Sequence, residues 1–360
     1  MNVNRQFYYL LIFGALLLWN CANNDNPGEE GGGTPDETTT LLILNEGSMG
    51  MNNATLARYN LQEDLITKEY FLDVNKRGLG DVANDMLLYG SKIYIAVNKS
   101  GTLEVVEATT GKSLRQIRME STGGQNKEPR RLAAHGGKVY VTSFDDTVTR
   151  IDTVSLAIDG SVNVGMDPEG IAIKNNRIYV ANSGGLNWAN GYDNTLSVIN
   201  LTSLTEEKKI EVGTNPGTVQ TDSQGDIYLT VIGNYDDEPG AFKVIRSGSS
   251  TVETITGIAS PQKFVINDNK AYIISGAYGV SNSLVVYDCL EEKIISDSFI
   301  SDGTEIPIMN NVTVDPVSGD LFVASTDYVH PGDLYCFDKN GKMKYRLTAV
   351  GINPSVVVFQ

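Results

Sequence analysis

One short pattern recurs seven times along this chain: a run of β-branched and aromatic residues, bounded by polar turns. The runs lie at residues 41–44, 92–96, 138–142, 177–181, 226–230, 270–274 and 320–324. Taken as equivalent, their central residues are Ile43, Tyr94, Tyr140, Tyr179, Tyr228, Tyr272 and Phe322, at spacings of 39 to 51 residues. A repeat of this length that contains only strands is typical of the blades of a β-propeller.

The segments around each run predict the rest of a blade. A segment with alternating apolar residues comes before the run, joined to it by a tight turn such as Gly136-Gly137 or Asn175-Asn176. Such dipeptides suit two-residue hairpins, which need positive φ. A third strand follows each run, for example at residues 196–199, and then a more polar fourth strand, for example at residues 113–118. The polar strand is expected at the outer edge, where one side meets water.

The two ends of the repeat array predict how the ring closes. The first run, residues 41–44, has no innermost strand before it, and the last innermost strand, residues 354–359, has no run after it. Pairing the two completes a blade and removes both free sheet edges. The sequence therefore predicts an all-β fold: a seven-bladed β-propeller over residues 41–360, closed by pairing of the C-terminal strand with the N-terminal strand.

Residues 1–20 have the pattern of a signal peptide. Arg5 precedes an apolar run at residues 7–18, which is too short to span a bilayer of about 30 Å. The run ends at Leu18-Trp19-Asn20-Cys21, which resembles the lipobox of bacterial lipoproteins. The resemblance implies that Cys21 is diacylated and becomes the first residue of the mature chain. The alternative is a plain secretory signal followed by an incidental cysteine.

Residues 21–40 are expected to form a flexible acidic tether. Residues 22–40 hold five acidic residues, four glycines and two prolines, with no basic residue. Such a segment buries too little apolar surface to fold. An acidic stretch after a lipidated cysteine also resembles the signal that sends lipoproteins of some Gram-negative bacteria to the cell surface. We therefore expect an outer-membrane lipoprotein exposed at the cell surface, although a simple spacer is the alternative.

Charge and composition narrow the function classes. The net charge of −16 and the lack of a basic, aromatic-rich groove argue against nucleic acid as a partner. Cys289 and Cys336 have no metal-ligand spacing and are expected to be buried thiols, with a disulfide as the alternative. The two histidines and the missing hydrolase motifs predict no catalytic residue, cofactor or metal site. Acids expected near the axial pore keep a metal-dependent hydrolase as an alternative: Asp81, Asp85, Glu128, Asp167 and Glu169.

Five long loops are expected on one face of the ring, at residues 45–55, 182–195, 231–240, 275–283 and 325–333. Long loops that a fold does not need are often functional. The candidate ligand-binding residues on them are Met49, Met51, Asn52, Trp188, Tyr192, Tyr235, Tyr278, Tyr328 and His330. Their amphipathic rings suit a large, flat ligand. The alternative for any one of them is that it folds back into a local core.

Arg130 and Arg131 are the paired arginines expected beside the pore on the same face. They are candidates to clamp a phosphate or carboxylate of the ligand. Pairing with the neighbouring acids is the competing interpretation.

Several short sequence motifs resemble those of one propeller family. Three segments that each end in Asp-Pro or Asn-Pro resemble the YncE/YVTN-repeat propellers: residues 165–168, 213–216 and 351–354. The third strands at residues 197–200 and 285–288 resemble them as well. Residues 44–56 and 80–86 resemble surface lipoproteins of this type from gut anaerobes, among them the BtuG-like proteins. That resemblance implies capture of a bulky small molecule, a corrinoid such as cobalamin, and its handover to a TonB-dependent outer-membrane transporter. A protein- or glycan-binding module without a small-molecule ligand is the alternative.

Overall fold

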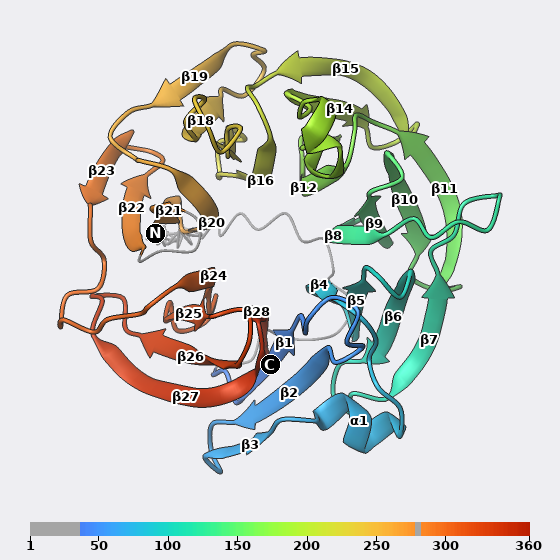
Figure 1. The fold of residues 1–360 in the computed structure, drawn as a ribbon, viewed down its shortest axis with the longest axis vertical. Helices are drawn as coiled ribbons and strands as arrows, with labels where there is room; N and C mark the ends of the chain where they lie inside the picture. The colour runs from blue at the N-terminus through green and yellow to red at the C-terminus, as the bar shows by residue number, and fades with distance from the viewer. Residues whose placement is uncertain (1–36, 278–281) are drawn as a thin grey trace, which may run out of the picture.

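The computed structural model describes residues 37–277 and 282–360. The expected signal peptide, most of the expected tether, Cys21 and Tyr278 lie outside the described residues. Within the described part, the strands form seven four-stranded antiparallel sheets arranged as a ring (Figure 1). The predicted seven-bladed β-propeller is therefore confirmed.

The blades are numbered along the chain, each from its innermost to its outermost strand. Blade 1 has β28 (Pro354–Phe359), β1 (Thr40–Asn45), β2 (Thr55–Asn60) and β3 (Leu65–Thr67). Blade 2 has β4 (Ala83–Tyr89), β5 (Lys92–Val97), β6 (Thr102–Glu107) and β7 (Ser113–Arg118). Blade 3 has β8 (Pro129–His135), β9 (Lys138–Ser143), β10 (Thr147–Asp152) and β11 (Ala157–Asn163). Blade 4 has β12 (Pro168–Lys174), β13 (Arg177–Asn182), β14 (Thr195–Asn200) and β15 (Thr205–Glu211).

Blade 5 has β16 (Pro216–Thr221), β17 (Ile227–Val231), β18 (Ala241–Ile245) and β19 (Val252–Ile255). Blade 6 has β20 (Pro261–Asn267), β21 (Lys270–Ser275), β22 (Ser283–Asp288) and β23 (Lys293–Ser296). Blade 7 has β24 (Met309–Val314), β25 (Leu321–Ser325), β26 (Pro331–Phe337) and β27 (Met343–Ile352). Two short helices interrupt the pattern: α1 (Tyr70–Asn75) and the 3₁₀ helix η1 (Gly185–Asn190). Neither was predicted from the sequence.

Blade 1 is assembled from both ends of the chain, as predicted. β28 pairs antiparallel with β1, so that Leu41 lies opposite Phe359 (Figure 1). The N–H of Thr39 donates to the carbonyl of Gln360 at 2.7 Å. β1 begins at Thr40, so the propeller includes the last residues of the expected tether. This pairing leaves no free sheet edge where the chain begins and ends.

The equivalence of Ile43 with the six aromatic residues is wrong by one position. Asn45 lies opposite Pro354 as Val97 lies opposite Ala83, which makes Leu42 the counterpart of Tyr94. Leu42 packs toward blade 2, whereas Ile43 packs toward blade 7. Because side chains alternate between the two faces of a strand, a shift of one residue reverses the face. Blade 1 has no aromatic residue here to mark the register.

The aromatic residues of the second strands fill the interfaces between blades. Tyr94 is fully buried and belongs to one apolar cluster with Leu132 and Val141 of blade 3. Tyr228 is likewise fully buried, in a cluster with Phe264 of blade 6. Each such ring removes a large apolar area from water. The outermost strands are mostly exposed and polar, as in β7 and β11, so the core lies between the sheets.

The helix α1 lies at the outer side of the ring, between β3 and β7 (Figure 1). Phe71 anchors it in the core of blades 1 and 2. The side chain of Asn75 joins it to blade 2, donating to the carbonyl of Gly111 at 2.9 Å and accepting from the N–H of Ser113 at 2.8 Å. None of the helices in the described residues is long and apolar enough to cross a membrane.

Candidate functional site

A repeated backbone turn directs the first residues of each innermost strand toward the ring axis. In six blades the residue before this strand has positive φ: Val82, Glu128, Asp167, Asn215, Ser260 and Asn353. Its carbonyl accepts an N–H from the residue after the second strand, as Ser183 donates to Asp167 at 3.2 Å. The pairing of the innermost strand with the second strand then shifts in register at the second and third residues of the innermost strand. Such bulges re-aim side chains, and here they turn them toward the pore.

The two bulge residues of the blades are Asn84 and Asp85, Arg130 and Arg131, Glu169 and Gly170, Gly217 and Thr218, Gln262 and Lys263, Asn310 and Asn311, and Ser355 and Val356. All except Ser355 line one central cavity of about 860 Å³. We call it the axial cavity. Its size falls in the range of small-molecule sites. Gly170 is required where the strands crowd, because a Cβ there would lie 2.3 Å from the carbonyl oxygen of Gly217.

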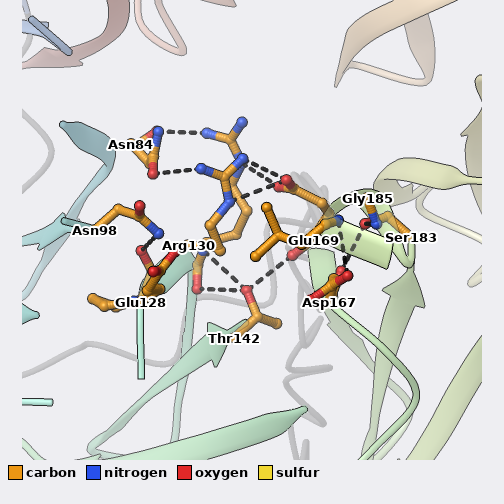
Figure 2. Close-up of polar contacts among 12 residues, drawn as sticks. Asn84, Asn98, Glu128, Arg130, Thr142, Asp167, Glu169, Ser183 and Gly185 are labelled. Atoms are coloured by element: carbon orange, nitrogen blue, oxygen red, sulfur yellow. Dashed lines mark hydrogen bonds and ion pairs between the residues drawn. The ribbon is translucent and has the colours of Figure 1, made fainter. Parts of the chain in front are cut away.

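Arg130 of β8 lies at the wall of the axial cavity and contacts residues of the innermost strands on both sides, β4 and β12 (Figure 2). Its Nε donates to Oε1 of Glu169 at 3.0 Å, and its Nη1 donates to Oδ1 of Asn84. Its guanidinium also stacks over the ring of Phe144, 4.4 Å from the centroid. The pairing of the arginines with nearby acids, weighed above as the competing interpretation, is thus present for Arg130.

Arg131 and Asp85 form a second charged group in the same wall. Arg131 donates to the carbonyl of Asn84, and its Nε lies 3.7 Å from Oε2 of Glu169. The carboxylate of Asp85 accepts the N–H of Leu132 at 2.8 Å. Burial raises the pKa of Asp85, and the charge of Arg131 opposes that rise. Burial also opposes ionisation of Glu169, but Arg130 and Arg131 outweigh it and lower the pKa of that carboxyl.

Lys263 is the third cation of the axial cavity, and sequence reasoning missed it. Burial lowers the pKa of its ammonium to about 8, although Glu46 acts in the opposite direction. A signal for it exists in the sequence. Lys263 stands two residues after Pro261, as Arg131 stands two residues after Pro129.

Four of the predicted aromatic residues line the loop side of the axial cavity: Trp188, Tyr192, Tyr235 and Tyr328. We call them the aromatic rim. Trp188 and Tyr235 are 67% and 63% exposed. The rings of Tyr192 and Tyr235 contact each other across the boundary of blades 4 and 5, with centroids 6.4 Å apart. Large exposed rings around a polar cavity are a feature of ligand sites.

The loop that carries Trp188 is held in place by two carboxylates. The carboxylate of Asp167 accepts the N–H of Leu186 at 2.9 Å, at the start of η1. Asp193 accepts the N–H and the hydroxyl of Thr195, which fixes the other end of the loop. Gly184 is needed between them, because its φ is 62° and a Cβ would lie 2.2 Å from the nitrogen of Asp193. The loop is therefore ordered before any ligand binds.

Two residues of the aromatic rim have strained backbones. Tyr235 and Tyr328 have φ values of 63° and 66°. This region costs a non-glycine residue about 1 kcal/mol or more. Local hydrogen bonds hold both loops: Asn234 accepts the N–H of Asp236 at 2.9 Å, and Thr326 accepts the N–H of Tyr328 at 2.9 Å. Strain of this kind concentrates at functional sites.

The sequence of the propeller matches a known protein family. Residues 39–359 match the family described as Domain of unknown function (DUF5074). The chain belongs to the DUF5074 family. The comparison with curated proteins returns no match.

Three solved structures share the propeller fold with this DUF5074 chain. Hydrazine synthase of Kuenenia stuttgartiensis has a TM-score of 0.55 and 16% identity, over 70% of this chain and 74% of its own. The computationally designed protein Ika8 has a TM-score of 0.58 and 11% identity, over 88% and 93%. Dihydro-heme d1 dehydrogenase NirN, in complex with DHE, has a TM-score of 0.56 and 11% identity, over 89% and 75%. At these identities the likeness shows the fold alone.

The structure does not bring the remaining predicted residues into the axial cavity. Met49 and Met51 are 73% and 67% exposed and are outside its lining. Asn52 lines a separate, smaller cavity of about 470 Å³ beside α1. His330 also lies outside, and its Nδ1 contacts Oδ2 of Asp327 at 2.7 Å. Tyr278 is among the residues that the structure does not describe.

The acids expected at the pore have partners within the DUF5074 fold. Asp81 accepts the N–H of Gly50, and Glu128 pairs with Lys99 at 2.7 Å. Across residues 37–277 and 282–360, no three His, Cys, Asp or Glu side chains are grouped as a metal site. The thiols of Cys289 and Cys336 are buried and free, as predicted.

Proposed function

We propose that this DUF5074 protein binds a bulky amphipathic small molecule of the corrinoid class in the axial cavity. The observation that carries this proposal is the convergence of Trp188, Tyr192, Tyr235 and Tyr328 on the loop side of a cavity of about 860 Å³. Exposed rings on ordered loops offer flat apolar contacts at low entropic cost. The charged and amide side chains below them supply polar contacts to the same ligand.

The chemistry of a corrinoid suits a site that has aromatic rings on its loop side and polar side chains below them. Its macrocycle presents flat faces to aromatic rings, and its rim carries amides that pair with amide side chains. In the cavity, the Nδ2 groups of Asn310 and Asn311 donate to the carbonyls of Pro354 and Ser355 at 2.7 and 2.9 Å. These contacts fix both amides before a ligand arrives. The resemblance of residues 44–56 and 80–86 to BtuG-like lipoproteins supports the same ligand class.

Binding of cyanocobalamin, measured by isothermal titration calorimetry, tests the proposal. We expect saturable binding, and we expect Trp188→Ala and Tyr235→Ala each to weaken it about tenfold or more, because each removes a large contact surface. Val154→Ala, an exposed apolar position in a turn after β10, is the matched control and should leave binding unchanged. No heat and no thermal shift with cyanocobalamin or cobinamide would refute the corrinoid class.

We further propose that Cys21 carries a lipid that anchors the protein to the outer membrane, facing the outside, for handover to a TonB-dependent transporter. The apolar run before Cys21 and the acidic residues after it support this placement. Metabolic labelling with an alkyne fatty acid should mark the wild type and spare Cys21→Ser. Equal labelling of both chains would contradict lipidation at this residue.

A second candidate function, docking of a protein partner, is favoured by exposed apolar side chains on two loops that Asn353 joins. Met49 and Met51 of blade 1 and Val329 of blade 7 are all exposed, and Asn353 joins the two loops that carry them through Gly47 and Thr326. Met49→Asp with Met51→Asp should then abolish capture of a partner and leave cyanocobalamin binding intact. Loss of cyanocobalamin binding in this variant would instead assign the methionines to the ligand site.

A further inference from the structure

Lys263 is a cation that the axial cavity holds without a close counter-charge. It occupies the second bulge position of β20 and lines the cavity. Among the described residues, none gives its Nζ a hydrogen bond or an ion pair. The equivalent Arg131 is engaged by Asn84 and Glu169.

The other charges around the axial cavity come from four elements. Arg130 and Arg131 of β8 are committed to Glu169 of β12. Asp85 of β4 accepts two backbone N–H groups, from Met86 and Leu132. Glu46, which follows β1, and Glu169 both attract Lys263, but neither forms a hydrogen bond or an ion pair with it.

Tyr192, Tyr235 and Tyr328 are the remaining titratable groups of the lining, and they lie on its loop side. The innermost strands β16, β24 and β28 contribute no charged side chain to the lining. A partly buried ammonium in this position therefore faces a cavity with room for a ligand and with no carboxylate in direct contact. An isolated charge of this kind is costly unless something pairs with it.

We propose that Lys263 is the anion subsite of the axial cavity and pairs with a phosphate or carboxylate group of the bound molecule. This rests on the proposed function and extends it by one chemical requirement on the ligand. In the corrinoid class the group would be the phosphodiester of the nucleotide loop, which cobalamin carries and cobinamide lacks. Charge-assisted hydrogen bonds to a phosphate oxygen are among the stronger polar contacts in proteins.

The subsite has a defined pH dependence. Burial lowers the pKa of Lys263 to about 8, so the ammonium is mostly charged at pH 7 and is half deprotonated near pH 8. A bound anion raises that pKa, because it favours the charged form. Affinity for the anion is therefore full below pH 8 and falls above it, by up to about tenfold per pH unit.

Titration of cyanocobalamin and cobinamide into three variants tests the subsite. Lys263→Gln should weaken cyanocobalamin about tenfold and leave cobinamide within about twofold, since it removes one charged hydrogen bond. Lys263→Arg should keep the preference for cyanocobalamin and lose its decline above pH 8. Lys243→Gln is the matched control, because burial also lowers the pKa of Lys243, which lies outside the cavity lining. Equal weakening of both corrinoids in Lys263→Gln would overturn the inference.

A second measurement separates this inference from the corrinoid proposal. If wild type binds neither corrinoid, that proposal falls, and inorganic phosphate still probes Lys263. In NMR spectra of lysine-labelled protein, phosphate should raise the titration midpoint of Lys263 relative to chloride at equal ionic strength, and should not move Lys243. An unchanged midpoint of Lys263 in saturating phosphate would overturn the anion subsite.

Discussion

The side chain of Asn353 donates from Nδ2 to the carbonyl of Gly47 at 2.9 Å, although the two residues are 306 positions apart in the sequence. The same side chain accepts the hydroxyl of Thr326 of blade 7. Asn353 also has a φ of 52°, a conformation that asparagine tolerates better than most residues. One residue thus joins blades 1 and 7 on the face that carries the aromatic rim.

We expect Asn353→Ala to lower the free energy of unfolding by about 2 kcal/mol, because its hydrogen bonds are lost and because alanine tolerates a positive φ less well than asparagine does. Asn353→Gly should cost about 1 kcal/mol, because it removes the bonds but not the permitted conformation. Urea unfolding measures both. Asn175→Ala, at a φ of 50° in a hairpin turn, controls mainly for strain, because its side chain makes only a long, exposed hydrogen bond to Ser247 at 3.5 Å. Identical midpoints for wild type and both Asn353 variants would show that the bridge contributes nothing.

Glu169 supports the charged wall of the axial cavity through Arg130 and Arg131. Glu169→Gln should lower the free energy of unfolding at pH 7 by about 2 kcal/mol, because it leaves two partly buried cations without their carboxylate. The pKa of Glu169 is lowered in the fold, so its contribution is complete above the ordinary range of a carboxyl and is lost as the pH falls through the folded value.

The difference between wild type and Glu169→Gln should therefore shrink below about pH 4. Urea unfolding from pH 3 to pH 7 follows it. Glu207→Gln, which removes an exposed partner of Arg177, should show little effect at either pH. A Glu169→Gln difference that persisted unchanged at pH 3 would rule out charge as its origin.

Much of the fold could be predicted from the sequence, because aromatic residues mark the same position in six blades. Tyr94 and Tyr140 show the register directly, since each stands between two β-branched residues in the sequence. Blade 1 lacks that marker, and Ile43 was assigned in place of Leu42. The helix α1 covers six residues, which is too short for a helical period to stand out.

The candidate site was only partly predictable, for two physical reasons. Loop topology placed Trp188 and Tyr235 on the correct face, because every loop between second and third strands emerges there. The bulge of each innermost strand, however, breaks the alternation that assigns side chains to faces. Alternation alone therefore does not show that Lys263 faces the pore, and only its place two residues after Pro261, equivalent to that of Arg131 after Pro129, indicates it. Met49 and Met51 share the face but not the cavity, a distinction that depends on loop conformation.

The two propeller cysteines should be unreactive in the native state. Burial raises the pKa of both Cys289 and Cys336 to about 12, so almost no thiolate exists at pH 8. With Cys21 changed to Ser, Ellman's reagent at pH 8 should report no fast-reacting thiol in the native protein and both thiols in guanidinium chloride. Rapid reaction of one thiol without denaturant would mean that its strand opens locally or that its surroundings are less apolar than described.

Lys263 should reduce the stability of the protein at neutral pH. Its pKa is lowered from the ordinary lysine value of 10.5 to about 8 in the fold. Between these values the unfolded chain binds a proton that the folded chain does not, so stability falls as the pH decreases from 10.5 to 8 and the full cost remains below pH 8. Lys263→Met should therefore raise the free energy of unfolding at pH 7 by about 1 to 2 kcal/mol. The gain should shrink from pH 8 upward, as measured by urea unfolding at several pH values. Lys263→Met that is less stable than wild type at pH 7 would show that the ammonium has a stabilising partner in the free protein.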